Sequence, residues 1–118
     1  MKTILVADDE YAIVEALSAL LTDEGYNVVT AANGEEALAR IADARPDVVL
    51  LDVMMPGIDG RGVLSRMRDD TATAAIPVIV MSAAARPLSP AQLGGAIFLR
   101  KPFDLAVLLR AIAKLVGG

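Results

Sequence analysis

The chain has 118 residues, a formal net charge of −4, no cysteine and no histidine. This composition suits one domain, residues 1–118, with its own core, and it excludes disulfides, thiolate or imidazole catalysis and metal sites built from Cys or His. The acidic balance without a dense Lys/Arg cluster argues against direct nucleic-acid binding, and the absence of a long apolar run or leader peptide predicts a cytoplasmic protein without membrane contact.

Five short apolar runs predict β-strands. The runs are continuous rather than alternating, which is typical of strands that are buried on both faces of a parallel sheet. We expect these strands, in chain order, at residues 4–7, 27–31, 48–51, 78–81 and 96–99.

Amphipathic segments between the runs predict helices. Gly25 and Gly117 suit the ends of the first and last of these helices, Pro46 stops the second, and Asp104 is placed to cap the last. We expect helices near residues 11–24, 34–44, 60–69 and 104–116.

The fourth connection, residues 83–95, is interrupted by Pro and Gly. We therefore expect at most a short helix near residues 89–94, with Ser89 as its N-cap and Pro90 in its first position. Strands that alternate with helices indicate an α/β fold with a parallel sheet and right-handed crossovers.

Ligand sites in such sheets lie beyond the carboxyl ends of the strands. Four of the five runs end at or beside a residue that can handle phosphate or a metal ion, whereas the run at 27–31 does not. These residues are Asp8 and Asp9, Asp52, Ser82 and Lys101. They predict one polar pocket at a single rim of the sheet.

The three carboxylates would repel one another in that pocket, and a hard divalent cation such as Mg²⁺ would reverse the cost. A simpler interpretation gives them separate structural roles, in which Asp8 and Asp9 favour the next helix N-terminus and Asp52 opens a loop. That interpretation explains less well why acids end both the first and the third strand.

Asp52 is the best candidate phosphoryl acceptor, because a carboxylate can form an aspartyl phosphate. Lys101 could pair with the phosphate, Ser82 could donate a hydrogen bond to it, and the turn after Asp52 could offer the Met54 carbonyl to the metal. Taken singly, Lys101 could equally be a solvated lysine and Ser82 a turn or cap serine.

Together these residues resemble the receiver domain of two-component response regulators. The resemblance covers essentially the whole chain, and its most specific segments are ILVADDE (4–10), VVLLDVMMPGIDG (48–60), PVIVMSA (77–83) and FLRKPF (98–103). It implies a flavodoxin-like (βα)5 doubly wound fold with the sheet order 2-1-3-4-5, here with a short or irregular fourth helix.

The resemblance also implies roles for individual residues. Asp52 would be phosphorylated, Asp9 would bind Mg²⁺ (or Mn²⁺) directly, Asp8 would often act through water, and the Met54 carbonyl would complete the protein ligands. Lys101 would be the family's lysine, with a cis bond to Pro102.

Two further residues would belong to the family's switch. Ser82 would move toward the phosphoryl group, and Phe98 would be the aromatic that turns inward behind it. Because Phe98 has no hydroxyl group to keep solvated, we expect a bias toward the buried rotamer, although an ordinary core aromatic is the alternative.

The chain departs from the family in two places. The stretch from Ser82 to Lys101 is a few residues short and carries prolines, which places in doubt partner binding on the face made by helix 4, strand 5 and helix 5. Met54 occupies a position that is often polar in the family, so we expect an altered rate of dephosphorylation.

The leading interpretation is a phosphorylation-controlled signalling module rather than an enzyme, although it would assist its own phosphorylation and dephosphorylation. A histidine kinase or histidine phosphotransfer protein would be its phosphodonor, because the chain has no histidine. The output partner or effector domain is unknown, and we expect a monomer, with dimerisation on phosphorylation left open.

Three rival functions fit the sequence less well. A flavin- or nucleotide-binding module would need a glycine-rich loop, whereas the first loop here is acidic. A phosphohydrolase with an aspartyl intermediate would need a second acid just after the nucleophile, where Val53 and Met54 stand. An interaction domain that is never phosphorylated would have no need for the intact set of acids, Ser82 and Lys101.

Overall fold

A five-stranded parallel sheet forms the centre of the computed structural model, which describes residues 1–83 and 88–117. The strand order is β2-β1-β3-β4-β5, as expected for the flavodoxin-like fold, and each strand pairs in parallel with its neighbours. The strands are β1 (Thr3–Ala7), β2 (Asn27–Ala31), β3 (Val48–Asp52), β4 (Val78–Ser82) and β5 (Ile97–Arg100).

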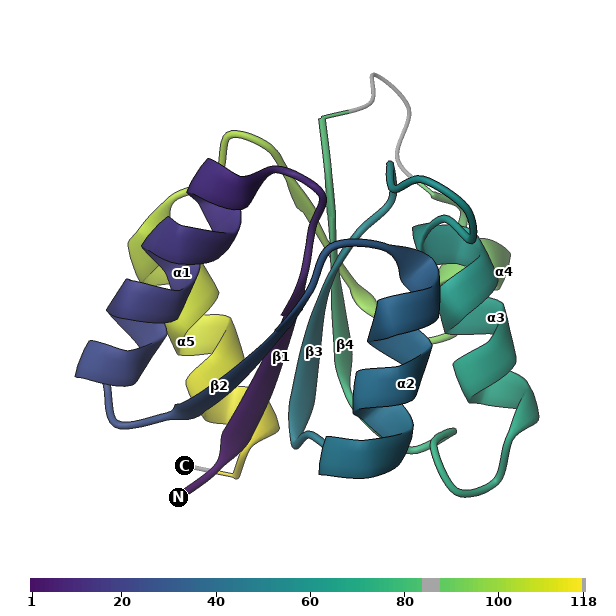
Figure 1. The fold of residues 1–118 in the computed structure, drawn as a ribbon, viewed down its shortest axis with the longest axis horizontal. Coiled ribbons are helices and arrows are strands. Elements are labelled where there is room, and N and C mark those ends of the chain that lie inside the picture. Colours follow the sequence, from purple (N-terminus) through teal and green to yellow (C-terminus); the bar gives the residue numbers. More distant parts are fainter. Residues whose placement is uncertain (84–87, 118) are drawn as a thin grey trace.

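Helices cover both faces of the sheet (Figure 1). α1 and α5 lie on one face, and α2, α3 and α4 lie on the other. The helices are α1 (Tyr11–Asp23), α2 (Gly34–Ala44), α3 (Gly60–Asp69), α4 (Pro90–Leu93) and α5 (Leu105–Leu115). The predicted helices are thus confirmed to within one or two residues.

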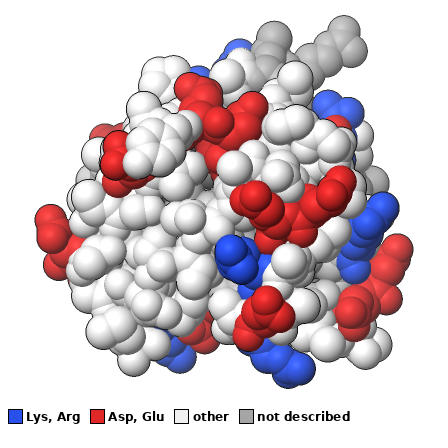
Figure 2. Space-filling view, viewed as in Figure 1, with Lys and Arg blue, Asp and Glu red and all other residues white. Residues whose placement is uncertain are grey.

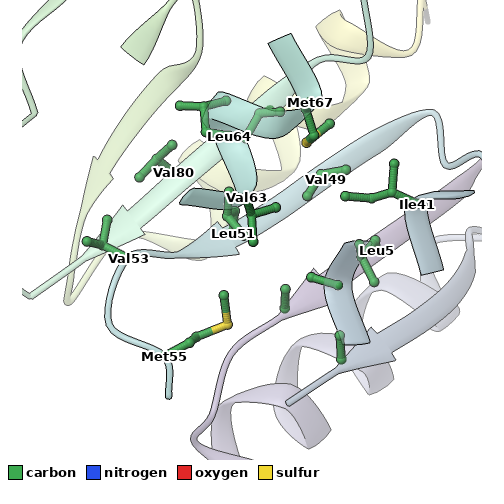
Figure 3. Packing of buried hydrophobic residues seen from close by; sticks show 14 of the residues in the cluster. Leu5, Ile41, Val49, Leu51, Val53, Met55, Val63, Leu64, Met67 and Val80 are labelled. Carbon is green, nitrogen blue, oxygen red and sulfur yellow. The ribbon is translucent and has the colours of Figure 1, made fainter. Parts of the chain in front are cut away.

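The continuous apolar runs of the strands supply two hydrophobic clusters, one on each face. All five residues of β3 and all five of β4 are buried. Side chains alternate along a strand, so Val49 and Leu51 point into the cluster under α2 and α3 (Figure 3), whereas Leu50 points into the cluster under α1 and α5. Each fully buried Leu of this kind contributes roughly 1.5–3 kcal/mol through the hydrophobic effect.

Local caps define the ends of the helices. Asp104 accepts a hydrogen bond from the Ala106 backbone nitrogen, and Gly25 follows α1 with a φ of 93°. Both features were predicted from the sequence. Asn33 and Asp59 also act as N-caps, for α2 and α3.

The fourth connection contains the predicted short helix. α4 has 4 residues, starts at Pro90 and is capped by Ser89, whose hydroxyl accepts from the Gln92 backbone nitrogen while the Gln92 side chain accepts from the Ser89 nitrogen. None of its residues is buried. The part of the predicted irregular segment at residues 84–87, including Pro87, lies outside the described residues.

Two further features bear on the site. The Lys101–Pro102 bond is cis, as the resemblance implied. None of the helices within residues 1–83 and 88–117 combines the length and apolar character that crossing a bilayer requires.

Candidate functional site

Backbone hydrogen bonds extend the sheet at the carboxyl ends of its strands. The Asp8 nitrogen donates to the Ala31 carbonyl at 3.1 Å, and the Lys101 nitrogen donates to the Ser82 carbonyl at 2.8 Å. Between them, the Val53 nitrogen donates to the Met81 carbonyl at 3.1 Å. The backbones that carry the polar side chains are therefore held by the sheet itself rather than by mobile loops.

Asp8 is buried and uses both carboxylate oxygens. Its Oδ1 accepts from the Glu10 backbone nitrogen at 2.9 Å, next to the start of α1, and its Oδ2 accepts from Lys101 Nζ at 2.8 Å. Asp8 therefore combines a local contact just before α1 with a contact to the other polar residues of the rim.

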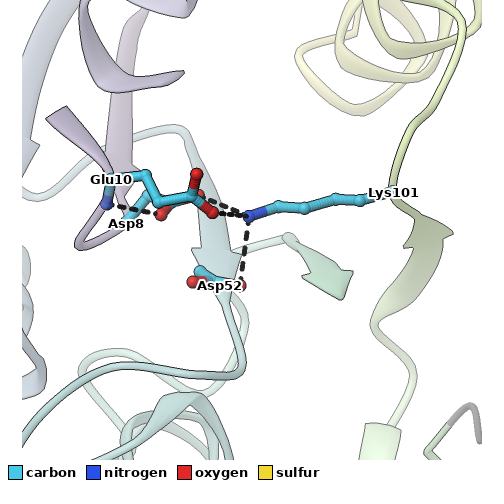
Figure 4. Close-up of polar contacts among 4 residues, drawn as sticks. All are labelled: Asp8, Glu10, Asp52 and Lys101. Carbon is cyan, nitrogen blue, oxygen red and sulfur yellow. Dashed lines mark hydrogen bonds and ion pairs between the residues drawn. The ribbon is translucent and has the colours of Figure 1, made fainter. Parts of the chain in front are cut away.

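Lys101 joins the acids of two strands (Figure 4). Its Nζ lies 2.8 Å from Asp8 Oδ2 and 3.4 Å from Asp52 Oδ1, with Glu10 Oε1 at 3.9 Å. The side chain of Lys101 is 12% exposed, and those of Asp8 and Asp52 are 0% and 5% exposed. Glu10, at 63% exposure, lies at the solvent edge of this group.

The three predicted acids come together. Carboxylate oxygens of Asp8, Asp9 and Asp52 all lie within 4.8 Å of one another. Asp8 and Asp52 are buried, whereas Asp9 is exposed. Figure 2 shows acidic side chains gathered on the upper part of the molecular face, above the carboxyl ends of the strands.

Burial, followed by the charge of Asp8, raises the pKa of Asp52 from 3.8 to about 6 against the opposing effect of Lys101. Burial by itself would lower the pKa of Lys101, but its hydrogen bond to Asp8 and the charges of Asp52 and Asp8 outweigh burial and raise it. One ammonium group therefore compensates only part of the negative charge that is collected here.

A divalent cation fits this arrangement chemically. The group offers hard carboxylate oxygens from two buried residues and one exposed residue, which is the ligand type that Mg²⁺ prefers, and the exposed side leaves room for the waters that Mg²⁺ usually keeps. The pKa of Asp52 is raised chiefly by burial and then by Asp8, and a bound cation would favour its charged form.

Comparison with known proteins agrees with this site. A model of the response regulator receiver domain matches residues 4–113. The chain is a response regulator receiver domain. It is 43% identical over 115 residues to the response regulator PleD of Caulobacter vibrioides, which covers 95% of this chain and 25% of PleD, so the chain spans a quarter of that relative.

Two further relatives match along their whole length. The protein PilH of Pseudomonas aeruginosa is 33% identical over 121 residues, with 100% of both chains covered. The crystal structure of the response regulator TrrA of Thermotoga maritima in complex with Mg²⁺-BeF has a TM-score of 0.88 and 37% identity, and the match covers 98% of this chain and 99% of TrrA.

The loop after β3 forms one wall of an open hollow in this receiver domain. The hollow has a volume of about 440 Å³, and Asp9 also lines it. Met54 lies in this loop and is 66% exposed. The other residues that line the hollow are Met55, Pro56, Gly57 and Asp59.

The two predicted switch residues lie on neighbouring strands. Ser82 ends β4 and is buried, one residue after Met81, the strand partner of Asp52. Phe98, on β5, is partly buried and packs against the cluster that includes Val80. The preferred rotamer of Phe98 stays a prediction.

The sequence interpretation missed the position of Glu10 beside Lys101. The DDE run at residues 8–10 offered the available signal, because a third acid just after the strand lies within reach of the same rim.

Proposed function

We propose that this receiver domain accepts a phosphoryl group on Asp52 in the presence of Mg²⁺. The observation that carries the proposal is the position of Asp52 Oδ1, 3.4 Å from Lys101 Nζ, inside a group of three carboxylates within 4.8 Å. The TrrA structure with Mg²⁺-BeF supports a divalent-cation site in this fold.

Asp8, Asp9, Asp52 and the Met54 carbonyl would hold the ion, with Mn²⁺ as a substitute. Bound Mg²⁺ would neutralise negative charge on the phosphoryl oxygens, which is the main requirement of phosphoryl transfer. Asp9 would ligate directly, and Asp8 would act through water, since one of its oxygens already accepts from Lys101 and the other from the Glu10 nitrogen.

In the transfer step, a carboxylate oxygen of Asp52 attacks phosphorus and forms the O–P bond. The bond from phosphorus to the donor breaks, and the donor leaves with its electron pair. Lys101 would pair with a phosphoryl oxygen. Water would later attack phosphorus and restore the carboxylate, so that the domain assists its own phosphorylation and dephosphorylation.

Phosphorylation would then shift a balance between two conformations. The Ser82 hydroxyl would donate to the phosphoryl group, and Phe98 would turn inward behind it. The register supports this coupling, because Ser82 follows the strand partner of Asp52, and Phe98 pairs with Val80 on the same strand.

Receiver domains of response regulators interact with histidine kinases and output effectors. For this chain we propose a single cytoplasmic domain that takes its phosphoryl group from a histidine kinase or a histidine phosphotransfer protein. The output partner would be an effector protein or a fused effector domain, with the receiver domain itself monomeric.

The decisive experiment is incubation with acetyl phosphate and Mg²⁺, followed by intact mass spectrometry. We expect the mass of one phosphoryl group to be added, and we expect Asp52→Asn or chelation of Mg²⁺ to prevent the addition. Asp47→Asn is a matched control, because Asp47 accepts from the Thr3 nitrogen at the other end of the sheet. Phosphorylation that persists in Asp52→Asn would refute the assignment of Asp52.

A further inference from the structure

The first residue of α2 lies against the loop that joins β3 to α3. Gly34 is buried, and a Cβ atom at this position would overlap the carbonyl oxygen of Ile58 and lie 2.7 Å from its carbonyl carbon and Cβ. Gly34 is absent from the residues with positive φ, so its backbone conformation does not require glycine. Glycine is required here because the backbones of Gly34 and Ile58 approach each other closely.

α2 cannot easily retreat from this contact. Ala37 and Ile41, on its inner face, are fully or almost fully buried in the hydrophobic cluster. Its amino-terminal end is held by Asn33, which accepts from the Glu36 nitrogen at 2.8 Å, and by Glu36, which accepts from the Ala32 nitrogen at 2.9 Å. A side chain added at Gly34 must therefore displace the loop at Ile58.

That loop carries residues that line the open hollow together with Asp9. Its two ends are joined by the hydrogen bond from the Gly60 nitrogen to the Val53 carbonyl, at 2.9 Å. A displacement at Ile58 is thus passed to the short segment between these ends, which includes Met54. We therefore expect the contact between α2 and Ile58 to influence the separation of Met54 and Asp9.

We propose that Gly34 is a positioning residue for the divalent-cation site, acting through the backbone of Ile58. This inference rests on the proposed binding of Mg²⁺ by Asp9, Asp52 and the Met54 carbonyl. Gly34 contacts neither the ion nor the phosphoryl group. Because Gly34 has no side chain, α2 can pack directly against the loop, and this packing sets the distance between the proposed ligands Asp9 and Met54.

Gly62 provides a matched control, because it contacts the same residue in a different way. A Cβ at Gly62 would lie 2.7 Å from Cγ2 of Ile58, which is a side-chain methyl group rather than backbone. Rotation of that side chain relieves the Gly62 contact, whereas only a shift of the backbone relieves the Gly34 contact.

Calorimetric titration of the metal-free protein with Mg²⁺ tests the proposal. We expect Gly34→Ala to raise the Mg²⁺ dissociation constant about tenfold, as changes to groups that orient metal ligands often do, and Gly62→Ala to leave it within about twofold.

The outcomes separate the two proposals. A wild-type chain without Mg²⁺ binding overturns both, whereas equal Mg²⁺ affinity in wild type and Gly34→Ala overturns only the positioning role. A lower Tm for Gly34→Ala with unchanged Mg²⁺ affinity would show a purely structural role and likewise overturn it.

A second pair of variants covers a failure of Gly34→Ala to fold. Ile58→Gly leaves the carbonyl oxygen at the contact but makes the loop backbone easier to shift, so in the double variant we expect the loop to move and the chain to fold. Weaker Mg²⁺ binding in the double variant than in Ile58→Gly alone supports the proposal, and equal binding in the two overturns it.

Discussion

β3 and β4 differ sharply from the neighbouring β5 and α4. Every residue of β3 and β4 is buried, whereas β5 lies at the edge of the sheet with no buried residue, and α4 has none either. Yet the site takes Asp52 from the buried pair β3 and β4, and it takes Lys101 from the residue that follows β5. We call β3 and β4 the buried half and β5 and α4 the less buried half. The difference shows that a well-packed strand can hold the Asp52 carboxylate, while a less buried strand positions the Lys101 ammonium that pairs with it.

The largest expected effect comes from truncating one leucine in each half, within the same hydrophobic cluster. Leu51 of β3 is fully buried, while Leu93 of α4 is only partly buried against that cluster. We expect Leu51→Ala to lower the free energy of unfolding by about 3 kcal/mol and Leu93→Ala by about 1 kcal/mol or less. Urea denaturation checks both values, and equal losses would remove the contrast.

The second effect concerns the charge held by the buried half. Because burial and Asp8 raise the pKa of Asp52 to about 6, its contribution to folding is favourable at low pH and is lost as pH rises from 3.8 through about 6. We expect Asp52→Asn to stabilise the metal-free protein at pH 7 by about 2 kcal/mol, with the advantage vanishing near pH 4. Thermal melts of both proteins across this range measure it.

Asp9→Asn is the control for that measurement. Asp9 belongs to the same acidic group but is exposed, so its replacement should stabilise the metal-free protein less. Addition of Mg²⁺ should stabilise the wild type more than Asp52→Asn. Identical dependence of stability on pH for wild type and Asp52→Asn would contradict the raised pKa assigned to Asp52.

A smaller effect is expected from Lys101, which links the two halves. Lys101→Met leaves the carboxylates of Asp8 and Asp52 without their shared ammonium. Because Lys101 keeps some exposure to solvent, we expect a loss of about 1–2 kcal/mol at pH 7 in the metal-free protein, less than for a fully buried pair. Mg²⁺ should reduce this loss, because a cation replaces the missing charge. Chemical denaturation with and without Mg²⁺ tests this, and a loss that Mg²⁺ leaves unchanged would count against a shared site.

The smallest effect is expected in α4. Ser89→Ala removes the hydroxyl of the capping box, which in a longer helix would cost about 1 kcal/mol. Since α4 has 4 residues and none is buried, we expect little change in global stability but faster amide hydrogen exchange at Gln92. Exchange at Leu51 should stay unchanged, and a large drop in global stability would show that α4 is part of the core.

Much of the fold could be predicted because the decisive signals are local. The runs of Val, Ile and Leu, the cap residues Ser89 and Asp104, and glycines after helices each act within a few residues of sequence. The meeting of Asp8, Asp52 and Lys101 could be predicted as well, because parallel strands bring their carboxyl ends to one rim. The resemblance to receiver domains added the cis bond at Pro102.

Other features could not be predicted, because they depend on distances between segments that are far apart in the chain. Nothing near Gly34 in the sequence shows that Ile58 would touch its backbone. The hydrogen bonds that Arg68 Nη1 donates to the Ala74 and Ile76 carbonyls likewise arise from the path of the chain after α3.

The amino-acid order by itself determined which residues enter strands, which strand ends carry charge and that these charges share one edge of the sheet, since periodicity and chain connectivity suffice for this. Only the tertiary structure decided how far each charge is removed from water, that one lysine serves two acids, and where α2 stops the loop after β3. Desolvation and close packing depend on every neighbour at once, and a linear pattern does not contain that information.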